Sequence, residues 1–177
     1  MNSSKVILVT GGSRSGKTAH ALSLAMPFKN RIYLATAEAI DGEMEDRIAR
    51  HQAERGTDFQ TIEEAKDLAG ALSNLPKGSD VVLIDCMTVW LGNLMHKNGV
   101  QKEPYAEVKE LLETLKTPPC TIIIVTNELG SGIIPHDAMT RTYRDHAGWL
   151  NQDIAKVAND VYLVACGLPL TLKGSVQ

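Results

Sequence analysis

The chain has 177 residues, of which 44% are hydrophobic and 22% charged, and its formal net charge is −3 at pH 7. This length and balance predict one globular domain over residues 1–177, with enough apolar side chains for a full core. The slightly acidic balance, without a cluster of lysine or arginine, argues against nucleic-acid binding through the phosphate backbone. We therefore expect a small-molecule partner.

Two features bear on the compartment in which the protein works. The polar start of the chain leads into an apolar run, residues 6–10, which is too short for a signal-peptide core or a membrane span. The three cysteines, Cys86, Cys120 and Cys166, lie far apart and lack the paired spacing of zinc or redox sites. We expect a cytoplasmic protein without a membrane span, with reduced cysteines in its core.

The first motif is a glycine-rich turn between the strand-like run 6–10 and a helix-like segment, residues 19–26. It reads Gly11-Gly12-Ser13-Arg14-Ser15-Gly16-Lys17-Thr18, which is the spacing of a phosphate-binding P-loop. In such a loop backbone N–H groups surround phosphate oxygens, Lys17 reaches the β- and γ-phosphates, and the Thr18 hydroxyl is placed to bind Mg²⁺. The motif predicts a nucleoside triphosphate site, while Arg14 fits either a phosphate contact or a solvated side chain.

The region after the P-loop helix supplies a further candidate. Residues 31–36 are predicted to form a second strand, whose end is expected beside the first strand. A helix over 43–55, capped by Asp41, then carries His51 one turn after Ile48. A histidine on such a half-apolar face is more often a packed or surface residue than a nucleophile, so the residues alone leave its role open.

A carboxylate closes the next strongly apolar strand. Residues 59–63 are predicted to form a short strand, and 68–75 a helix that ends before Pro76. The run Val81–Asp85 then has the form of a Walker B strand, which makes Asp85 a candidate Mg²⁺ ligand, directly or through water.

The second half of the chain continues the alternation of strands and helices. Predicted helices cover 88–96, 104–116 and 137–159, and predicted strands cover 120–126, 161–165 and 170–172. The long helix is expected to turn one apolar face inward, made of Met139, Tyr143, Ala147, Leu150, Ile154 and Val157. On the same helix, Arg141, Arg144 and Asp145 are interpreted as an ion-pair network rather than a site.

This alternation predicts an α/β fold with a mainly parallel central sheet flanked by helices, and a ligand site at the carboxyl ends of the strands. Polar residues stand at four of the predicted ends: Thr10, Thr36, Asp85 and Thr126. Their convergence supports a nucleotide site there. No chemistry is assigned to the remaining histidines, which lack a partner at a telling spacing: His20, His96, His136 and His146.

Several runs, in order along nearly the whole chain, resemble those of one family. The most specific are RIARH at 47–51, TNELGSGIIP at 126–135 and RDHAGWLNQ at 144–152. The family is the bifunctional adenosylcobinamide kinase and adenosylcobinamide-phosphate guanylyltransferase of adenosylcobalamin synthesis. The resemblance implies a RecA-like P-loop NTPase domain that phosphorylates adenosylcobinamide with ATP or GTP. It then implies guanylylation of adenosylcobinamide phosphate with GTP, Mg²⁺ as the metal, and a homotrimer.

The resemblance also implies roles for single residues. His51 matches the histidine that carries GMP covalently in this family, and a neutral imidazole is a competent nucleophile near neutral pH. Asp85 replaces the glutamate expected in some relatives, and its shorter reach leaves direct or water-mediated metal binding open. Glu63 fits a solvated acid as well as a nucleotide contact. The other implied nucleotide-binding positions are Ala35, Thr36, Ala37, Gln52, Ala53, Glu54 and Arg55.

Two other functions compete with this interpretation. A P-loop kinase for a different small alcohol would need Lys17, Thr18 and Asp85 but not His51. A nucleotide-dependent switch is disfavoured, because residues 126–129 do not supply the Asn-Lys-x-Asp element with which such switches bind guanine.

Overall fold

The computed structural model of the protein describes residues 4–38 and 58–174. Its strands are β1 (Val6–Gly11), β2 (Arg31–Ala35), β3 (Gln60–Glu63), β4 (Val81–Asp85), β5 (Thr121–Val125), β6 (Asp160–Ala165) and β7 (Leu168–Lys173). Its helices are α1 (Lys17–Ala25), α3 (Leu68–Ser73), α4 (Met87–Asn98), α5 (Ala106–Lys116) and α6 (Ala138–Val157). The predicted helix over 43–55 lies outside the described residues.

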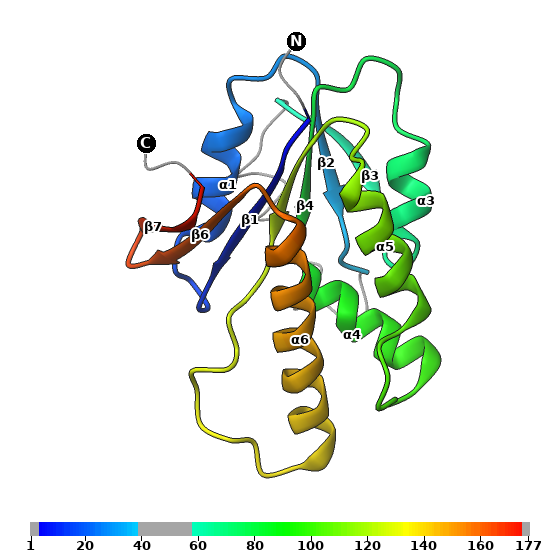
Figure 1. Cartoon of the computed structure of the whole chain (residues 1–177), viewed down its shortest axis with the longest axis vertical. Helices are drawn as coiled ribbons and strands as arrows, with labels where there is room; N and C mark the ends of the chain where they lie inside the picture. Colours follow the sequence, from blue (N-terminus) through cyan, green and yellow to red (C-terminus); the bar gives the residue numbers. More distant parts are fainter. Residues whose placement is uncertain (1–3, 39–57, 175–177) are drawn as a thin grey trace.

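These strands form one sheet in the order β3-β2-β4-β5-β1-β6-β7 (Figure 1). Every neighbouring pair is parallel except β6 and β7, which form an antiparallel hairpin. The predicted α/β fold with a mainly parallel sheet is confirmed. Because the strands from β1 to β6 run the same way, their carboxyl ends share one edge of the sheet, here called the carboxyl edge. The opposite edge is called the amino edge.

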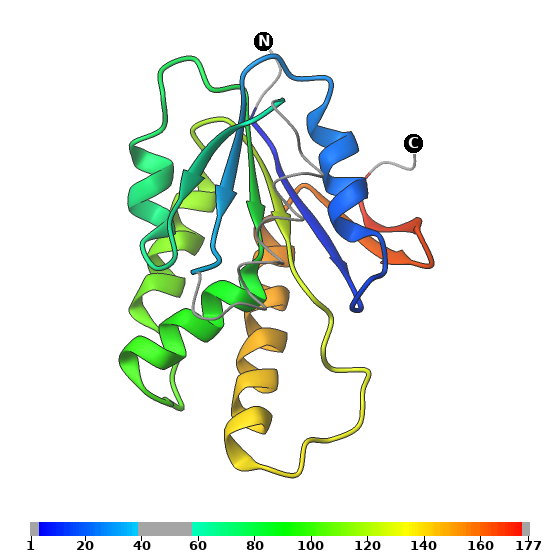
Figure 2. The same cartoon turned by 180° about the vertical axis from the view of Figure 1, so that it is seen from behind.

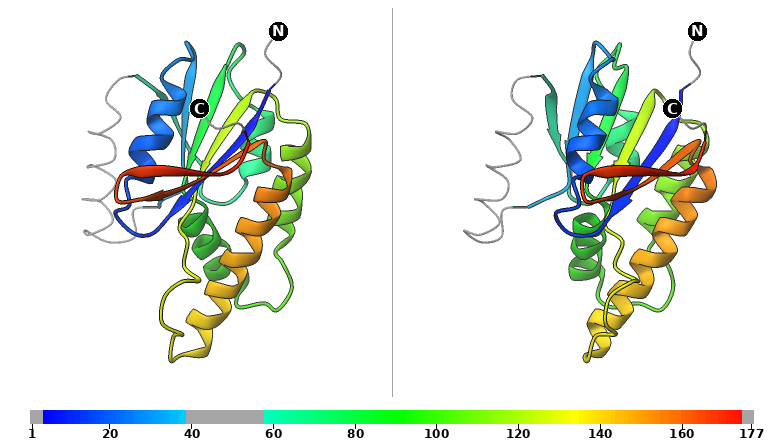
Figure 3. Two further views of the ribbon diagram at one scale, coloured as in Figure 1. Left: turned by 60° about the vertical axis from the view of Figure 1, so that its left-hand side comes forward. Right: turned by 90° about the vertical axis from the view of Figure 1, so that its left-hand side faces the viewer.

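The central strands are mostly apolar because helices cover both faces of the sheet (Figures 2 and 3). All five residues of β5 are buried. On one face α1 packs through Ala21 and Ala25. On the other face α3, α4, α5 and α6 bury a larger cluster, which includes Trp90 and Leu111.

The expected pairing of the first two strands is wrong. Strand β2 lies between β3 and β4, so β4 and β5 separate it from β1. A parallel connection through a helix can skip positions in a sheet, and the skipped positions are filled by strands that come later in the chain. The consequence for the site is that β5 lies between the P-loop strand and the strand that ends at Asp85.

Two expected core residues are exposed instead. Figure 1 shows α6 extending beyond the carboxyl edge, and Met139 in its first turn is 61% exposed because no other element covers that end. Cys166 is exposed in the turn between β6 and β7, whereas Cys86 and Cys120 are buried as predicted. The rest of the predicted inward face of α6 is buried or partly buried.

In the part of the chain that the structure describes, no helix combines the length and the hydrophobicity that crossing a bilayer requires.

Candidate active site

The P-loop forms the turn from β1 into α1 at the carboxyl edge. Gly16 is the N-cap of α1 and has φ 94°, in the left-handed region that favours glycine. The turn is closed by a hydrogen bond from Ser15 N to Gly12 O at 3.3 Å, and the helix begins with His20 N donating to Gly16 O at 3.0 Å. The predicted strand–loop–helix context is therefore confirmed.

Close packing explains why glycine occupies the first position of the motif. A Cβ at Gly11 would overlap the backbone carbonyl of Val164 in β6 and would lie 2.6 Å from Ser15 Oγ. At Gly16 a Cβ would lie 3.1 Å from Gly167 Cα, in the turn between β6 and β7. That turn also holds the loop directly, because Gly167 N donates to Ser15 O at 2.8 Å.

The predicted metal-binding pair is brought together at the start of α1. The Thr18 hydroxyl donates to Asp85 Oδ2 at 3.2 Å, and Tyr33 on β2 donates to the same oxygen at 2.9 Å. Lys17 Nζ donates to Gly12 O at 3.0 Å, so its ammonium lies against the loop. Arg14 is exposed, with φ 55°.

This oxygen set fits Mg²⁺, a hard cation that prefers hydroxyl, carboxylate and phosphate oxygens. Across the described ranges no three His, Cys, Asp or Glu side chains cluster in a way that could hold a metal ion. Thr18 and Asp85 would therefore share the ion with phosphate oxygens and water, as is common when Mg²⁺ is bound together with a nucleotide.

The other predicted nucleotide contacts lie either near the ends of β2 and β3 or outside the described residues. Ala35 ends β2 beside Asp85, and Thr36 is fully buried. The Thr36 side chain already bonds the backbone of Cys86, as donor at 2.9 Å and acceptor at 2.8 Å, so it braces β2 against β4. Glu63 is exposed at the end of β3, next to Ala35. Ala37 follows Thr36 and is partly buried. The second group lies outside the described residues: His51, Gln52, Ala53, Glu54 and Arg55.

The sequence alone does not predict a role for two residues near the site. Tyr33 bonds Asp85, and its position on a buried strand gave no sign of that role. Asn127 lies two residues after the end of β5, between the P-loop and the end of β4. The next residue, Glu128, donates its backbone N–H to Gly11 O at 3.0 Å, which fixes this segment against the P-loop.

The Glu128 side chain stabilises the loop that contains it by hydrogen bonds to the loop backbone. Its carboxylate accepts hydrogen bonds from Gly130 N at 2.6 Å and Ser131 N at 3.2 Å. Burial alone would raise the pKa of Glu128, but these bonds outweigh it and leave the pKa below its ordinary value. A carboxylate stabilised as an anion in this way is a poor proton acceptor.

The charged residues of α6 confirm only part of the predicted network. Arg144 and Asp145 form an ion pair at 3.8 Å. Arg141 instead donates to the carbonyl of Pro135 at 3.0 Å and so ties the preceding loop to the helix. His146 is buried and contacts Gln101 O through Nε2 at 2.8 Å, which is a packing role.

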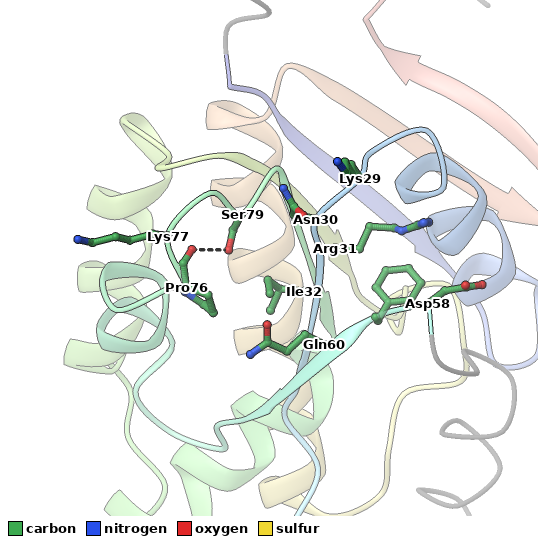
Figure 4. Close-up of a pocket in the computed structure, with 10 residues that line it drawn as sticks. Lys29, Asn30, Arg31, Ile32, Asp58, Gln60, Pro76, Lys77 and Ser79 are labelled. Atoms are coloured by element: carbon green, nitrogen blue, oxygen red, sulfur yellow. Dashed lines mark hydrogen bonds between the residues drawn. The ribbon is translucent and has the colours of Figure 1, made fainter.

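A cavity of about 390 Å³ lies away from this site, at the amino edge. Figure 4 shows that it is lined by the starts of β2 and β3 and by the loop before β4, with Lys29 and Lys77 on different sides of it. Since the P-loop and Asp85 are at the carboxyl edge, this cavity is not part of the candidate active site.

Comparison with known proteins agrees with this geometry. The sequence model of a family described as "Cobinamide kinase / cobinamide phosphate guanyltransferase" matches residues 7–172. The bifunctional adenosylcobalamin biosynthesis protein CobP of Pseudomonas aeruginosa is 42% identical over 168 residues, which cover 94% of this chain and 96% of that protein. The bifunctional adenosylcobalamin biosynthesis protein CobU of Escherichia coli is 35% identical, over 95% of this chain and 99% of that protein.

Solved structures with the same fold are distant in sequence. An ATPase from a bacterial type III secretion system aligns with a TM-score of 0.56 at 10% identity, over 94% of this chain and 56% of that one. The RadB recombinase aligns with a TM-score of 0.51 at 17% identity, over 90% of this chain and 73% of that one. These likenesses identify a P-loop NTPase fold and nothing finer.

Proposed function

Because this chain belongs to the cobinamide kinase / cobinamide phosphate guanyltransferase family, we propose that its carboxyl edge carries out two successive transfers from nucleotides to one corrinoid substrate. The chain is a bifunctional enzyme of adenosylcobalamin biosynthesis, a cobinamide kinase and a cobinamide phosphate guanylyltransferase. The observation that carries the proposal is the P-loop with Thr18 bonded to Asp85 at 3.2 Å. That pair is where a nucleotide's phosphates and Mg²⁺ would be held.

The first transfer is a phosphorylation. The aminopropanol hydroxyl of adenosylcobinamide attacks the γ-phosphorus of ATP or GTP, and the bond from that phosphorus to the β–γ bridging oxygen breaks. A nucleoside diphosphate leaves, and adenosylcobinamide phosphate forms. Lys17 and the backbone N–H groups of the P-loop stabilise the charge that develops on the phosphates, and bound Mg²⁺ would neutralise part of the same charge.

The second transfer is a guanylylation through His51. An imidazole nitrogen attacks the α-phosphorus of GTP, the bond to the α–β bridging oxygen breaks, and pyrophosphate leaves. A phosphate oxygen of adenosylcobinamide phosphate then attacks the same phosphorus and displaces His51, which gives adenosylcobinamide-GDP. The support for His51 is its match to the family's histidine. The same match suggests nucleotide contacts at 35–37, 52–55 and Glu63.

Intact-mass measurement tests this scheme most directly. The protein incubated with GTP and Mg²⁺ should gain the mass of one GMP, and His51→Ala should lose this adduct while it still phosphorylates adenosylcobinamide. Lys17→Ala should lower the rates of both reactions by at least about 100-fold, because both depend on phosphates held by one loop. A wild-type protein that phosphorylates another alcohol and never forms the adduct would favour the kinase-only alternative.

The resemblance also suggests a cytoplasmic homotrimer. Sedimentation equilibrium of the purified chain would measure the oligomeric state directly, because a trimer has three times the mass of the 19.2 kDa monomer. A monomer at micromolar concentration would contradict the proposed assembly.

A further inference from the structure

Asn127 lies between the P-loop and the start of α4, the helix that follows Asp85. On one side, the neighbouring Glu128 N–H bonds Gly11 O at 3.0 Å. On the other side, Asn127 Nδ2 donates to Thr88 Oγ1 at 3.3 Å, just beyond Asp85. The position follows from the strand order, because β5 lies between β1 and β4 and Asn127 follows its last residues.

A network of partly buried hydrogen bonds fixes this segment. Asn151 on α6 donates to the Asn127 backbone carbonyl at 3.0 Å and accepts from the Thr126 hydroxyl at 2.8 Å. Tyr143 on the same helix donates to Thr88 O at 2.6 Å. Two residues on one side of α6 therefore hold both Asn127 and its partner Thr88 in place, which limits the positions that the carboxamide can take.

One atom of this well-held group has no partner. Asn127 Oδ1 is buried, and no residue in the described part of the chain donates a hydrogen bond to it. Since a buried amide oxygen is costly to leave unbonded, a ligand that carries a hydrogen-bond donor would stabilise this group. Phosphate groups of the nucleotide accept hydrogen bonds, so they do not meet this need. The hydroxyl of the phosphoryl acceptor does.

We infer that Asn127 Oδ1 accepts a hydrogen bond from the substrate hydroxyl that attacks the γ-phosphorus. This inference rests on the proposed kinase reaction. An amide does not take up a proton, so Asn127 orients the hydroxyl oxygen toward the phosphorus. As the new oxygen–phosphorus bond forms and the bond to the bridging oxygen breaks, the hydroxyl proton moves to an oxygen of the transferred phosphoryl group. Asn127 thus acts in the first transfer only.

The test compares Asn127→Ala with the wild type in both reactions. For phosphorylation of adenosylcobinamide we expect kcat to fall about 10- to 100-fold, with the KM for the nucleotide and the Mg²⁺ dependence unchanged. Covalent labelling with GMP in the absence of corrinoid uses no substrate hydroxyl, so its rate should stay at the wild-type value. Thr88→Val removes the acceptor of the Asn127 Nδ2 hydrogen bond. This variant should also lose kinase activity, by a smaller factor, and should label with GMP at the wild-type rate.

Asn151→Ala is the matched control, since it removes the bonds to Thr126 and to the Asn127 backbone while leaving the Asn127 side chain intact. If Asn127 had a purely structural role, Asn127→Ala and Asn151→Ala would both lower the melting temperature, and each would reduce the two reactions to the same extent. That result would overturn the inference. A shifted Mg²⁺ dependence would overturn it too, because that points to a metal-bound water as the donor. So would an unchanged kcat in Asn127→Ala. A wild-type protein without any kinase activity would instead refute the proposed function.

Discussion

At the amino edge of the sheet, Asn30 N donates to Asp80 Oδ2 at 2.8 Å, and Asp80 N donates back to Asn30 O at 2.9 Å. At the carboxyl edge, by contrast, Thr10 Oγ1, Ser15 Oγ and Asn127 Oδ1 are buried without a partner among the described residues. Each such atom costs about 1–3 kcal/mol of folding stability. The hydrogen bonds at the amino edge thus join neighbouring parts of the sheet, whereas the carboxyl edge has polar atoms that a ligand could bond.

Arg31 at the amino edge shows that the contrast is one of degree. Its Nε is also buried without a partner in the described ranges, but its guanidinium lies over the Phe59 ring, 5.8 Å from the centroid. A cation over an aromatic face is stabilised by the ring's charge distribution. The unpartnered atom there belongs to a packed cation, whereas the three at the carboxyl edge belong to residues in the P-loop or next to it.

The largest expected effect comes from filling the space beneath the P-loop. Gly11→Ala would place a methyl group against the Val164 carbonyl and Ser15 Oγ, so β1 or the loop must shift. We expect nucleotide affinity, measured by calorimetric titration with GTP, to fall at least about 100-fold. Gly148→Ala is the control, because a Cβ there meets nothing within 4 Å, and it should bind GTP normally. Normal binding by Gly11→Ala would break the proposed link between loop shape and affinity.

A substitution at the amino edge should have the opposite signature. Asp80→Ala removes the acceptor of Asn30 N, so the free energy of unfolding should fall by about 1–2 kcal/mol while kcat for either transfer is unchanged. Denaturant titration and the two activity assays measure this. Glu113→Ala, which removes only an exposed ion pair with Lys116, should cost less than about 0.5 kcal/mol. If Asp80→Ala lost activity under conditions in which it is fully folded, the amino edge would influence catalysis at the carboxyl edge.

The smallest expected change in activity comes from substitution of the exposed cysteine, Cys166. Burial, with the nearby charge of Asp80, raises the pKa of Cys120 to about 11, and burial raises the pKa of Cys86 as well. At pH 8 only about one Cys120 in a thousand is the reactive thiolate, so iodoacetamide should add one label to the native protein, at Cys166. Raising the pH to 9 should not add a second. Cys166→Ser should prevent labelling and change kcat less than about twofold, and two labels on the native protein would contradict the burial of the other thiols.

Local patterns in the sequence were sufficient to predict the P-loop and the helices and strands within the described residues. The apolar runs before Gly11 and Asp85 form the expected strands, and helical spacing predicted the inward face of α6 from Tyr143 onward. They were not sufficient to predict the strand order. A parallel crossover connection does not fix which strand will lie beside the one it leads to. Met139 was misassigned for a related reason: its spacing is helical and apolar, but the helix continues beyond the sheet.

The site was predictable where a motif fixes it and not where the fold assembles it. Lys17, Thr18 and Asp85 could be named from spacing alone, and the structure brings Thr18 and Asp85 together. Asn127 could not, since a single asparagine after a strand is ordinary loop composition. Its position becomes informative only when β5 is placed between β1 and β4 and when α6 is seen to hold it.

The bond from Gly167 to Ser15 has a consequence for the order in which the protein matures. The P-loop follows the first strand, but part of its support comes from the turn between β6 and β7, the last two described strands in chain order. The loop can therefore reach its final shape only after β6 has paired with β1. Folding intermediates in which β6 and β7 are still unpaired should contain much of the sheet and yet bind phosphate poorly.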